Sequence, residues 1–169
     1  MGTSVAGISA ASMLGRASFA QGQDQLRLGL VGCGGRGTGA AFNATSASPD
    51  VQIAAIADLF PDRLNSSRAH LDQLGERVSV TDEDCYVGWD AYKRLMARAD
   101  IDIVILATPP HFRPIHFKEA VKQGKHVFME KPVAVDPAGV RQVIAAAKEA
   151  DAKNLSVVSG TQRRHELCY

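Results

Sequence analysis

The sequence has little of what several protein classes require. Its three cysteines, Cys33, Cys85 and Cys168, are far apart and form no CxxC pair, which argues against a disulfide framework and a cysteine-based zinc site. The five histidines show no metal-ligand spacing. No run of about 18 apolar residues is present to span a membrane. The net charge of +1 lacks the basic excess of a nucleic-acid-binding protein. With 46% hydrophobic residues, the 169-residue chain resembles one globular domain that uses a ligand or cofactor.

Residues 1–20 are predicted to be the remnant of an export leader. The stretch Val5–Leu14 is small, mildly apolar and uncharged, and Ser18 and Ala20 have the spacing of a signal-peptidase site. An arginine just before that site, Arg16, resembles a twin-arginine leader, although no Arg-Arg pair precedes the apolar stretch. The alternative is an ordinary frayed N-terminus. A functional leader would place the protein in the periplasm or outside the cell, and otherwise we expect a cytoplasmic protein.

From Gln25 onward, short apolar runs alternate with helical patterns. Continuously apolar runs are typical of strands buried in a parallel sheet. The run Ile101–Ala107 stops at Thr108-Pro-Pro110, because proline cannot continue a central strand. The predicted strands are residues 26–31, 51–57, 78–80, 101–107, 126–129 and 155–158, and the predicted helices lie around residues 40–42, 61–74, 89–96, 117–124 and 136–147.

This alternation predicts an α/β fold. Strand–helix–strand units need right-handed crossovers, so residues 21–169 are expected to form a doubly wound parallel sheet, a Rossmann fold of six strands in the order 3-2-1-4-5-6. An acidic N-cap followed by proline predicts a helix start at Asp136-Pro137. The apolar stripe predicted to face the sheet from this helix consists of Val140, Val143, Ile144 and Ala147.

A glycine-rich loop follows the first predicted strand and leads into a helix. Its sequence, Gly32-Cys-Gly-Gly-Arg-Gly37, matches the G-x-G-x-x-G pattern of dinucleotide-binding loops. In such a loop Gly32 permits the tight turn, Gly34 lets the backbone approach a pyrophosphate, and Gly37 lets helix and strand pack closely. The helix N-terminus adds free N–H groups for the phosphates. Arg36 either contacts the pyrophosphate or is a solvated residue of the first turn.

An acidic residue ends the second predicted strand where a dinucleotide site needs one. Asp58 follows the loop at the spacing of about 20 residues that is typical of such sites. A carboxylate at this position accepts both ribose hydroxyls and repels a 2′-phosphate, so the expected cofactor is NAD rather than NADP. Arg63 could tolerate NADP by turning toward the ribose. The alternative role for Asp58 is that of a plain turn residue.

A charged motif, Glu130-Lys131-Pro132, follows the predicted strand 126–129. Open α/β folds bind their ligands at the carboxyl edge of the sheet, where this motif is expected to lie. A lysine beside an oxidised nicotinamide could polarise or deprotonate a hydroxyl as hydride leaves the carbon. The alternative is a surface salt-bridge pair before a proline that forms a turn.

In this order, the motifs resemble those of the Gfo/Idh/MocA oxidoreductases, the relatives of glucose–fructose oxidoreductase and inositol dehydrogenase. The resemblance covers residues 27–164, the family's N-terminal dinucleotide-binding domain, and Glu-Lys-Pro is its most specific mark. It implies that Lys131 lies near the reactive carbon and that Thr108-Pro109 and Glu130 line the ribose and nicotinamide side of the cofactor. The residues expected at the cofactor are Gly32, Gly34, Gly35, Arg36, Gly37, Asp58, Thr108, Pro109, His111, Glu130 and Lys131.

Members of this family continue into a C-terminal α/β domain that supplies most of the substrate pocket, together with an aspartate and a histidine of the acid–base set. We expect this domain to be missing from the chain. Residues 160–164 resemble the beginning of the second domain. His165 and Glu166 are not expected to replace the missing acid–base residues.

The expected function is that of the NAD-binding domain of an oxidoreductase acting on CH–OH groups of a sugar or cyclitol, with Lys131 as the catalytic residue. One alternative is redox-neutral chemistry, by a glycosidase or a sugar transhydrogenase that regenerates its NAD within each cycle. Export would favour this alternative because free NAD is scarce outside the cytoplasm. Another alternative is a non-catalytic dinucleotide-binding module. The expected partner is a sugar or polyol, and the full-length protein is expected to be a homo-oligomer that binds no metal.

Overall fold

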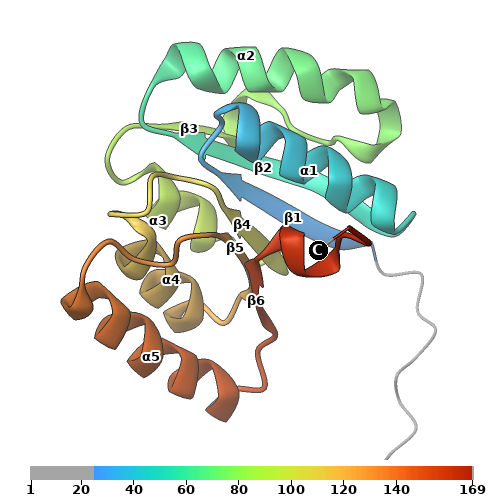
Figure 1. Ribbon diagram of the computed structural model, residues 1–169. Helices are drawn as coiled ribbons and strands as arrows, with labels where there is room; N and C mark the ends of the chain where they lie inside the picture. Colours follow the sequence, from blue (N-terminus) through green and yellow to red (C-terminus); the bar gives the residue numbers. More distant parts are fainter. Residues whose placement is uncertain (1–24, 169) are drawn as a thin grey trace, which may run out of the picture.

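Six parallel strands form the centre of the fold (Figure 1). The computed structural model describes residues 25–168, so the leader predicted at residues 1–20 lies outside the described residues. The strand order β3-β2-β1-β4-β5-β6 confirms the predicted doubly wound sheet. The strands are β1 (Leu26–Val31), β2 (Val51–Asp58), β3 (Cys85–Val87), β4 (Ile103–Leu106), β5 (His126–Glu130) and β6 (Val157–Gly160).

Helices cover both faces of the sheet (Figure 1). One face carries α1 (Gly35–Ala47) and α2 (Pro61–Leu71), and the other carries α3 (Ala91–Met96), α4 (Arg113–Lys122) and α5 (Pro137–Ala152). The predicted cap of α5 is confirmed, because the Asp136 carboxylate accepts a hydrogen bond of 2.6 Å from the backbone N–H of Gly139. Within residues 25–168, none of the helices has both the length and the apolar character needed to cross a membrane.

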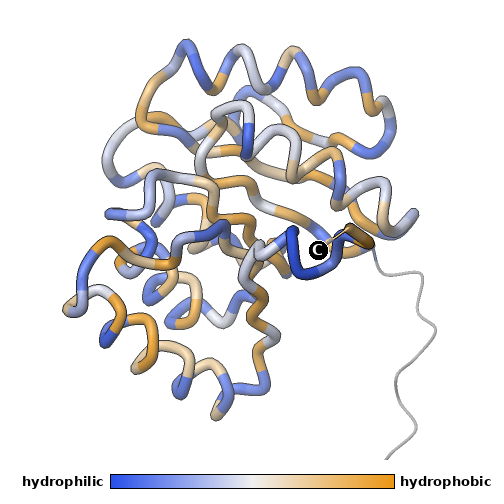
Figure 2. The backbone as a smooth tube through the Cα atoms, viewed as in Figure 1, coloured by the Kyte–Doolittle hydropathy of each residue, from blue (hydrophilic) through white to orange (hydrophobic). Residues whose placement is uncertain are grey.

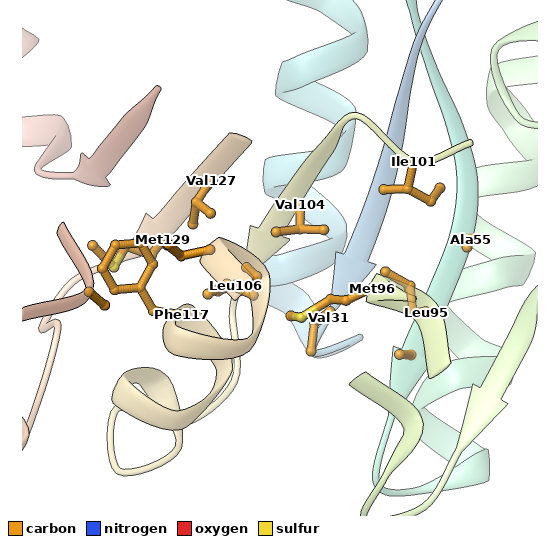
Figure 3. Close-up of a cluster of buried hydrophobic side chains, with 14 of the residues drawn as sticks. Val31, Ala55, Leu95, Met96, Ile101, Val104, Leu106, Phe117, Val127 and Met129 are labelled. Carbon is orange, nitrogen blue, oxygen red and sulfur yellow. The ribbon is translucent and has the colours of Figure 1, made fainter. Parts of the chain in front are cut away.

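Successive side chains of the central strands point to opposite faces of the sheet and belong to two separate hydrophobic cores. In β4, Val104 and Leu106 point toward α3, α4 and α5 (Figure 3), whereas Ile105 packs on the opposite side with α1 and α2. Both cores are closed by helices, which explains why the central strands are apolar on both faces and stand out in the hydropathy view (Figure 2). The carboxyl edge of this sheet is the rigid base of the candidate site.

The third strand lies later in the chain than predicted. Val78 makes only an isolated bridge with Ile53, while β3 is formed by Cys85–Val87 beside the end of β2. The prediction of a strand at residues 78–80 was therefore wrong. As an edge strand of three half-buried or exposed residues, β3 carries no buried apolar run that a sequence pattern could reveal.

The apolar stripe of α5 is also rotated from its predicted position. Val143, Ala146 and Ala150 are the buried residues of α5, whereas Val140 and Ile144 are 41% and 51% exposed. The helix lies at the edge of the molecule beside α4, so only a narrow stripe is covered (Figure 1). The prediction that Val140 and Ile144 face the sheet was wrong.

Candidate dinucleotide-binding site

The glycine-rich loop between β1 and α1 depends on close backbone approaches. Gly32 has a φ of +100°, and a Cβ atom there would lie 2.6 Å from the backbone nitrogen of Thr108. At Gly37, a Cβ atom would collide with the carbonyl oxygen of Gly32. The first glycine therefore makes the turn and the last lets α1 sit directly against the loop.

The beginning of α1 offers open space and free donors to an anion. No side chain caps the helix and no acidic residue occupies its first turn. The atom that a Cβ at Gly34 would approach is Nη1 of Arg63, at 3.8 Å, and a Cβ at Gly35 would have nothing within 4 Å. Uncapped N–H groups at the positive end of a helix bind phosphates well. The loop therefore fits the pyrophosphate of a dinucleotide.

Asp58 is fixed at the end of β2 by two backbone donors. Its Oδ2 accepts a hydrogen bond of 2.7 Å from the N–H of Cys33, and its Oδ1 accepts one of 2.9 Å from the N–H of Phe60. Each carboxylate oxygen keeps a lone pair, so the group can still accept from ribose hydroxyls. The structure thus joins the acid to the glycine-rich loop at the carboxyl end of β2.

Cys33, the second residue of the glycine-rich loop, has an unreactive thiol. Burial, reinforced by the nearby Asp58 carboxylate, raises the pKa of its thiol to about 12. The thiol is therefore protonated at physiological pH, and its sulfur lies 3.5 Å from the carbonyl oxygen of Ala57. Cys33 is therefore a packing residue of the hydrophobic core, and its protonated thiol is not a nucleophile.

A cavity of about 400 Å³ opens at the carboxyl edge of the sheet. Its volume lies in the range of small-molecule sites. The cavity brings together five of the residues predicted for cofactor binding, which are Gly32, Gly34, Asp58, Thr108 and Pro109. It lies at the point where β1 is flanked by β2 and β4, and there the strand order reverses, as it does in other doubly wound folds that bind nucleotides.

Aromatic residues that the sequence analysis did not assign to the site form one wall of this cavity. The Tyr92 and His116 rings lie 4.1 Å apart, Phe112 and His116 lie 6.0 Å apart, and Trp89 meets Phe112 at 6.2 Å. Trp89 is 71% exposed and precedes α3, so the prediction that placed it inside a helix was wrong. The rings come from two segments, residues 89–92 and 112–116, and nothing in the sequence shows that these two segments form one surface.

Two side chains of α4 hold Thr108 in place. Nδ1 of His116 lies 3.1 Å from Oγ1 of Thr108, and Arg113 donates from Nη2 to the Thr108 carbonyl. Burial, aided by the positive charge of Arg113, lowers the pKa of His116 to about 4. His116 is therefore a neutral hydrogen-bonding residue at physiological pH. Arg113 is itself buried, and burial lowers its pKa.

The motif at the end of β5 splits into a buried and an exposed residue. Glu130 is 4% exposed, and its Oε1 accepts a 2.7 Å hydrogen bond from Nε of Arg36 as well as a contact from Nη2. Lys131 is exposed, and its amine makes no hydrogen bond or ion pair with any of residues 25–168. Arg36 thus has a partner that neither predicted role included, and Glu130 pairs with Arg36 rather than with Lys131.

The remaining predicted residues, Arg36, Glu130 and Lys131 among them, do not line the cavity. His111 is exposed and its ring packs edge-on against Phe112, at 5.4 Å. Gly35 and Gly37 belong to the first turn of α1, behind the loop that lines the cavity. Across the described part of the chain, no three histidine, cysteine, aspartate or glutamate side chains gather in a way that could hold a metal ion.

Comparison with known proteins assigns the family. The model of the Gfo/Idh/MocA oxidoreductase family, with an NAD-binding Rossmann fold, matches residues 26–159. A glycosyl hydrolase family 109 protein of Solibacter usitatus is 35% identical over 112 residues, which is 64% of this chain and 24% of that protein. The glycosyl hydrolase family 109 protein 2 of a Shewanella species is 37% identical over 115 residues, 66% of this chain and 24% of that protein.

Solved structures share the fold. Apo scyllo-inositol dehydrogenase from Lactobacillus casei superposes with a TM-score of 0.65 at 25% identity, covering 85% of this chain and 39% of that chain. Biliverdin reductase from a Synechocystis species, at 20% identity and a TM-score of 0.62 over 80% of this chain and 37% of that one, shares the fold alone. The chain spans about a quarter of the length of the curated relatives it matches. It belongs to the Gfo/Idh/MocA oxidoreductase family and forms that family's NAD-binding Rossmann domain.

Proposed function

We propose that this chain is the cofactor-binding half of an NAD-dependent oxidoreductase that acts on a CH–OH group of a sugar or cyclitol. The observation that carries the proposal is the position of Lys131. Its amine is exposed at the carboxyl edge of the sheet, directly after Glu130, which is joined to the glycine-rich loop through Arg36. An unengaged amine at the carboxyl edge of the sheet, where open α/β folds bind their ligands, suits proton transfer to or from a hydroxyl.

In this proposal, one set of residues binds the cofactor and another residue transfers the proton of the substrate hydroxyl. Bound NAD would supply the hydride acceptor. The glycine-rich loop and Asp58 would hold the pyrophosphate and the adenosine ribose, while Thr108 would border the other end of the cofactor. Lys131 would take the hydroxyl proton as the substrate is oxidised. The likeness to scyllo-inositol dehydrogenase supports a polyol as the substrate class.

Redox-neutral cleavage of a glycoside is the second candidate. It is favoured by the curated relatives at 35% and 37% identity, which carry the name glycosyl hydrolase family 109. In such chemistry the same NAD site and the same Lys131 would serve an oxidation and a later reduction, with no net NADH. We also propose that residues 1–20 direct export, and an exported enzyme would need this internal regeneration of its cofactor.

The test uses a full-length version that includes a substrate domain, with Lys131→Met as the variant. Methionine keeps the bulk of the side chain and removes the proton-transferring group. Turnover should fall by about 10²- to 10⁴-fold, because general acid–base groups contribute that much. Lys118→Met, an exposed lysine of α4, is the matched control and should keep full turnover. Near-normal turnover with poor NAD binding would reassign Lys131 to cofactor positioning.

The same assay separates the two candidate reactions. Net NADH formation on a sugar or cyclitol supports the dehydrogenase, whereas glycoside cleavage without net NADH supports the glycosidase. NAD binding with neither reaction would favour a non-catalytic module. For this 169-residue chain alone we expect NAD binding without turnover, and substrate-dependent NADH formation by it would contradict the need for a second domain.

A further inference from the structure

Arg113, the first residue of α4, is a buried charge whose hydrogen bonds are mostly unfilled. The residue is 1% exposed. Nη2 donates to the carbonyl oxygen of Thr108, whereas Nε and Nη1 are buried and have no hydrogen-bond partner within residues 25–168. A buried guanidinium usually pairs with a carboxylate, because desolvation of an isolated charge is costly. An arginine in this state points to a role other than stability.

The carboxylate whose charge reaches Arg113, that of Glu130, is engaged elsewhere. Glu130 favours the charged form of Arg113 electrostatically, but its Oε1 accepts from Nε and Nη2 of Arg36. His116, which also feels the Arg113 charge, is neutral at physiological pH because its pKa is lowered to about 4. Two guanidinium groups and one carboxylate thus leave one positive charge in excess. Since Arg113 and Glu130 are both buried, water screens this excess poorly.

Arg113 lies on the side of the crevice opposite Asp58. A doubly wound fold binds a dinucleotide across its sheet, with one mononucleotide on each side of the point where the strand order reverses. In the proposed function Asp58, at the end of β2, holds the adenosine ribose, so the nicotinamide belongs on the side of β4 and β5. Arg113 holds the carbonyl of Thr108 after β4, and its charge interacts with that of Glu130 at the end of β5. The excess positive charge is therefore on the nicotinamide side.

From this arrangement we infer that the buried charge of Arg113 makes the site favour NADH over NAD⁺. The two cofactors differ by one charge, because the nicotinamide ring is a cation in NAD⁺ and neutral in NADH. A fixed positive charge raises the free energy of the cationic ring and leaves the neutral ring almost unaffected. Stabilising NADH favours hydride transfer from a CH–OH group to the cofactor. The inference rests on the NAD-binding part of the proposed function and is independent of proton transfer at Lys131.

The experiment measures the affinities of the 169-residue chain for NAD⁺ and for NADH by calorimetry and compares their ratio. Arg113→Gln removes the charge, and its amide can still donate to the Thr108 carbonyl. It should shift the ratio toward NAD⁺ by about 3- to 15-fold, the range that Coulomb's law gives for partly screened unit charges about 10 Å apart. Arg113→Lys keeps the charge and should keep the ratio within about twofold. Lys118→Gln, which removes an exposed charge from the same helix, is the matched control.

Glu130→Gln is the opposite test, because it removes the negative charge from the same group of three. The ratio should then move further toward NADH, whereas a purely structural role for either residue would weaken both cofactors equally. Urea unfolding shows whether each variant is folded, and Glu130→Gln keeps the inference testable if Arg113→Gln is not. An unchanged ratio in either folded variant, or shifts in the same direction in both, would overturn the inference. Failure of the unaltered chain to bind either cofactor would instead contradict the proposed function.

Discussion

The two ends of the dinucleotide crevice are built in different ways. At the β1–α1–β2 end, glycine packing and backbone donors make the site: Gly37 presses against Gly32, and Asp58 is held by two N–H groups. At the β4–β5 end, the site is held by the buried polar side chains of His116, which lies within hydrogen-bond distance of Thr108, and Glu130, which pairs with Arg36 of α1.

This difference determines how each end can fail. Steric contacts between backbone atoms leave no room for an added methyl group, and they do not depend on pH. Buried polar side chains tolerate small changes of shape but lose stability when their charge state changes, because desolvation penalises an uncompensated charge. Steric changes should therefore damage the first end most, and changes of charge or pH should damage the second.

The largest effect is expected for Gly37→Val. The new side chain would collide with the Gly32 carbonyl, and α1 could not stay against the loop. We expect a loss of about 3 kcal/mol or more in the free energy of unfolding, measured with urea. Gly35→Ala is the matched control, because a Cβ there has open space, and its stability should stay within about 0.5 kcal/mol. Equal losses in the two variants would break the steric account of this end.

At the β4–β5 end, stability should depend on pH through the protonation of His116. The folded-state pKa of His116 is lowered to about 4 from 6.5, so the unfolded chain binds the proton more readily. The stabilising contribution of neutral His116 is fully present above pH 6.5 and is lost as pH falls toward 4. Over that window the linked loss should reach about 3 kcal/mol in the free energy of unfolding.

His116→Gln provides the comparison, because glutamine does not titrate and can still hydrogen-bond to Thr108. Other acidic groups, such as Asp84 and Asp100, whose pKa values are lowered by hydrogen bonds and by Arg98, titrate in both proteins and cancel in the difference. The unaltered chain should therefore lose more stability than the variant between pH 7 and pH 4. Parallel pH curves for the two proteins would contradict the lowered pKa of His116 in the folded state.

A smaller effect is expected for Asp58→Ala on cofactor binding. The change removes charge-assisted hydrogen bonds to the ribose, each contributing roughly 1.5–3 kcal/mol. NAD⁺ affinity should fall about 10- to 100-fold by calorimetry, and discrimination against NADP⁺ should weaken. Asp62→Ala removes an equal charge from the exposed first turn of α2 and serves as the control. An unchanged affinity in Asp58→Ala would leave the residue with a turn role only.

The sequence predicts the first end of the crevice well because its determinants are local. The loop 32–37 and Asp58 follow known spacings, and the strands read as apolar runs since helices cover both faces. Where burial is partial the pattern fails, as in the edge strand β3 and the exposed residues Val140 and Ile144 of α5.

The second end of the crevice could not be derived in the same way. The pairing of Arg36 with Glu130 joins side chains 94 residues apart, and neither residue type signals the other. Likewise, the ring contact between Tyr92 and His116 depends on how α3 and α4 lie on the sheet. Such contacts are consequences of packing, so only the folded arrangement reveals them.

The central claim is that residues 25–168 form an NAD site whose ribose end is set by Asp58. Calorimetric titration of the 169-residue chain with NAD⁺ and with NADP⁺ tests it most directly. The account predicts one NAD⁺ bound per chain, with NADP⁺ at least tenfold weaker because its 2′-phosphate would meet the Asp58 carboxylate. Equal affinities for the two cofactors, or no binding of either, would contradict it.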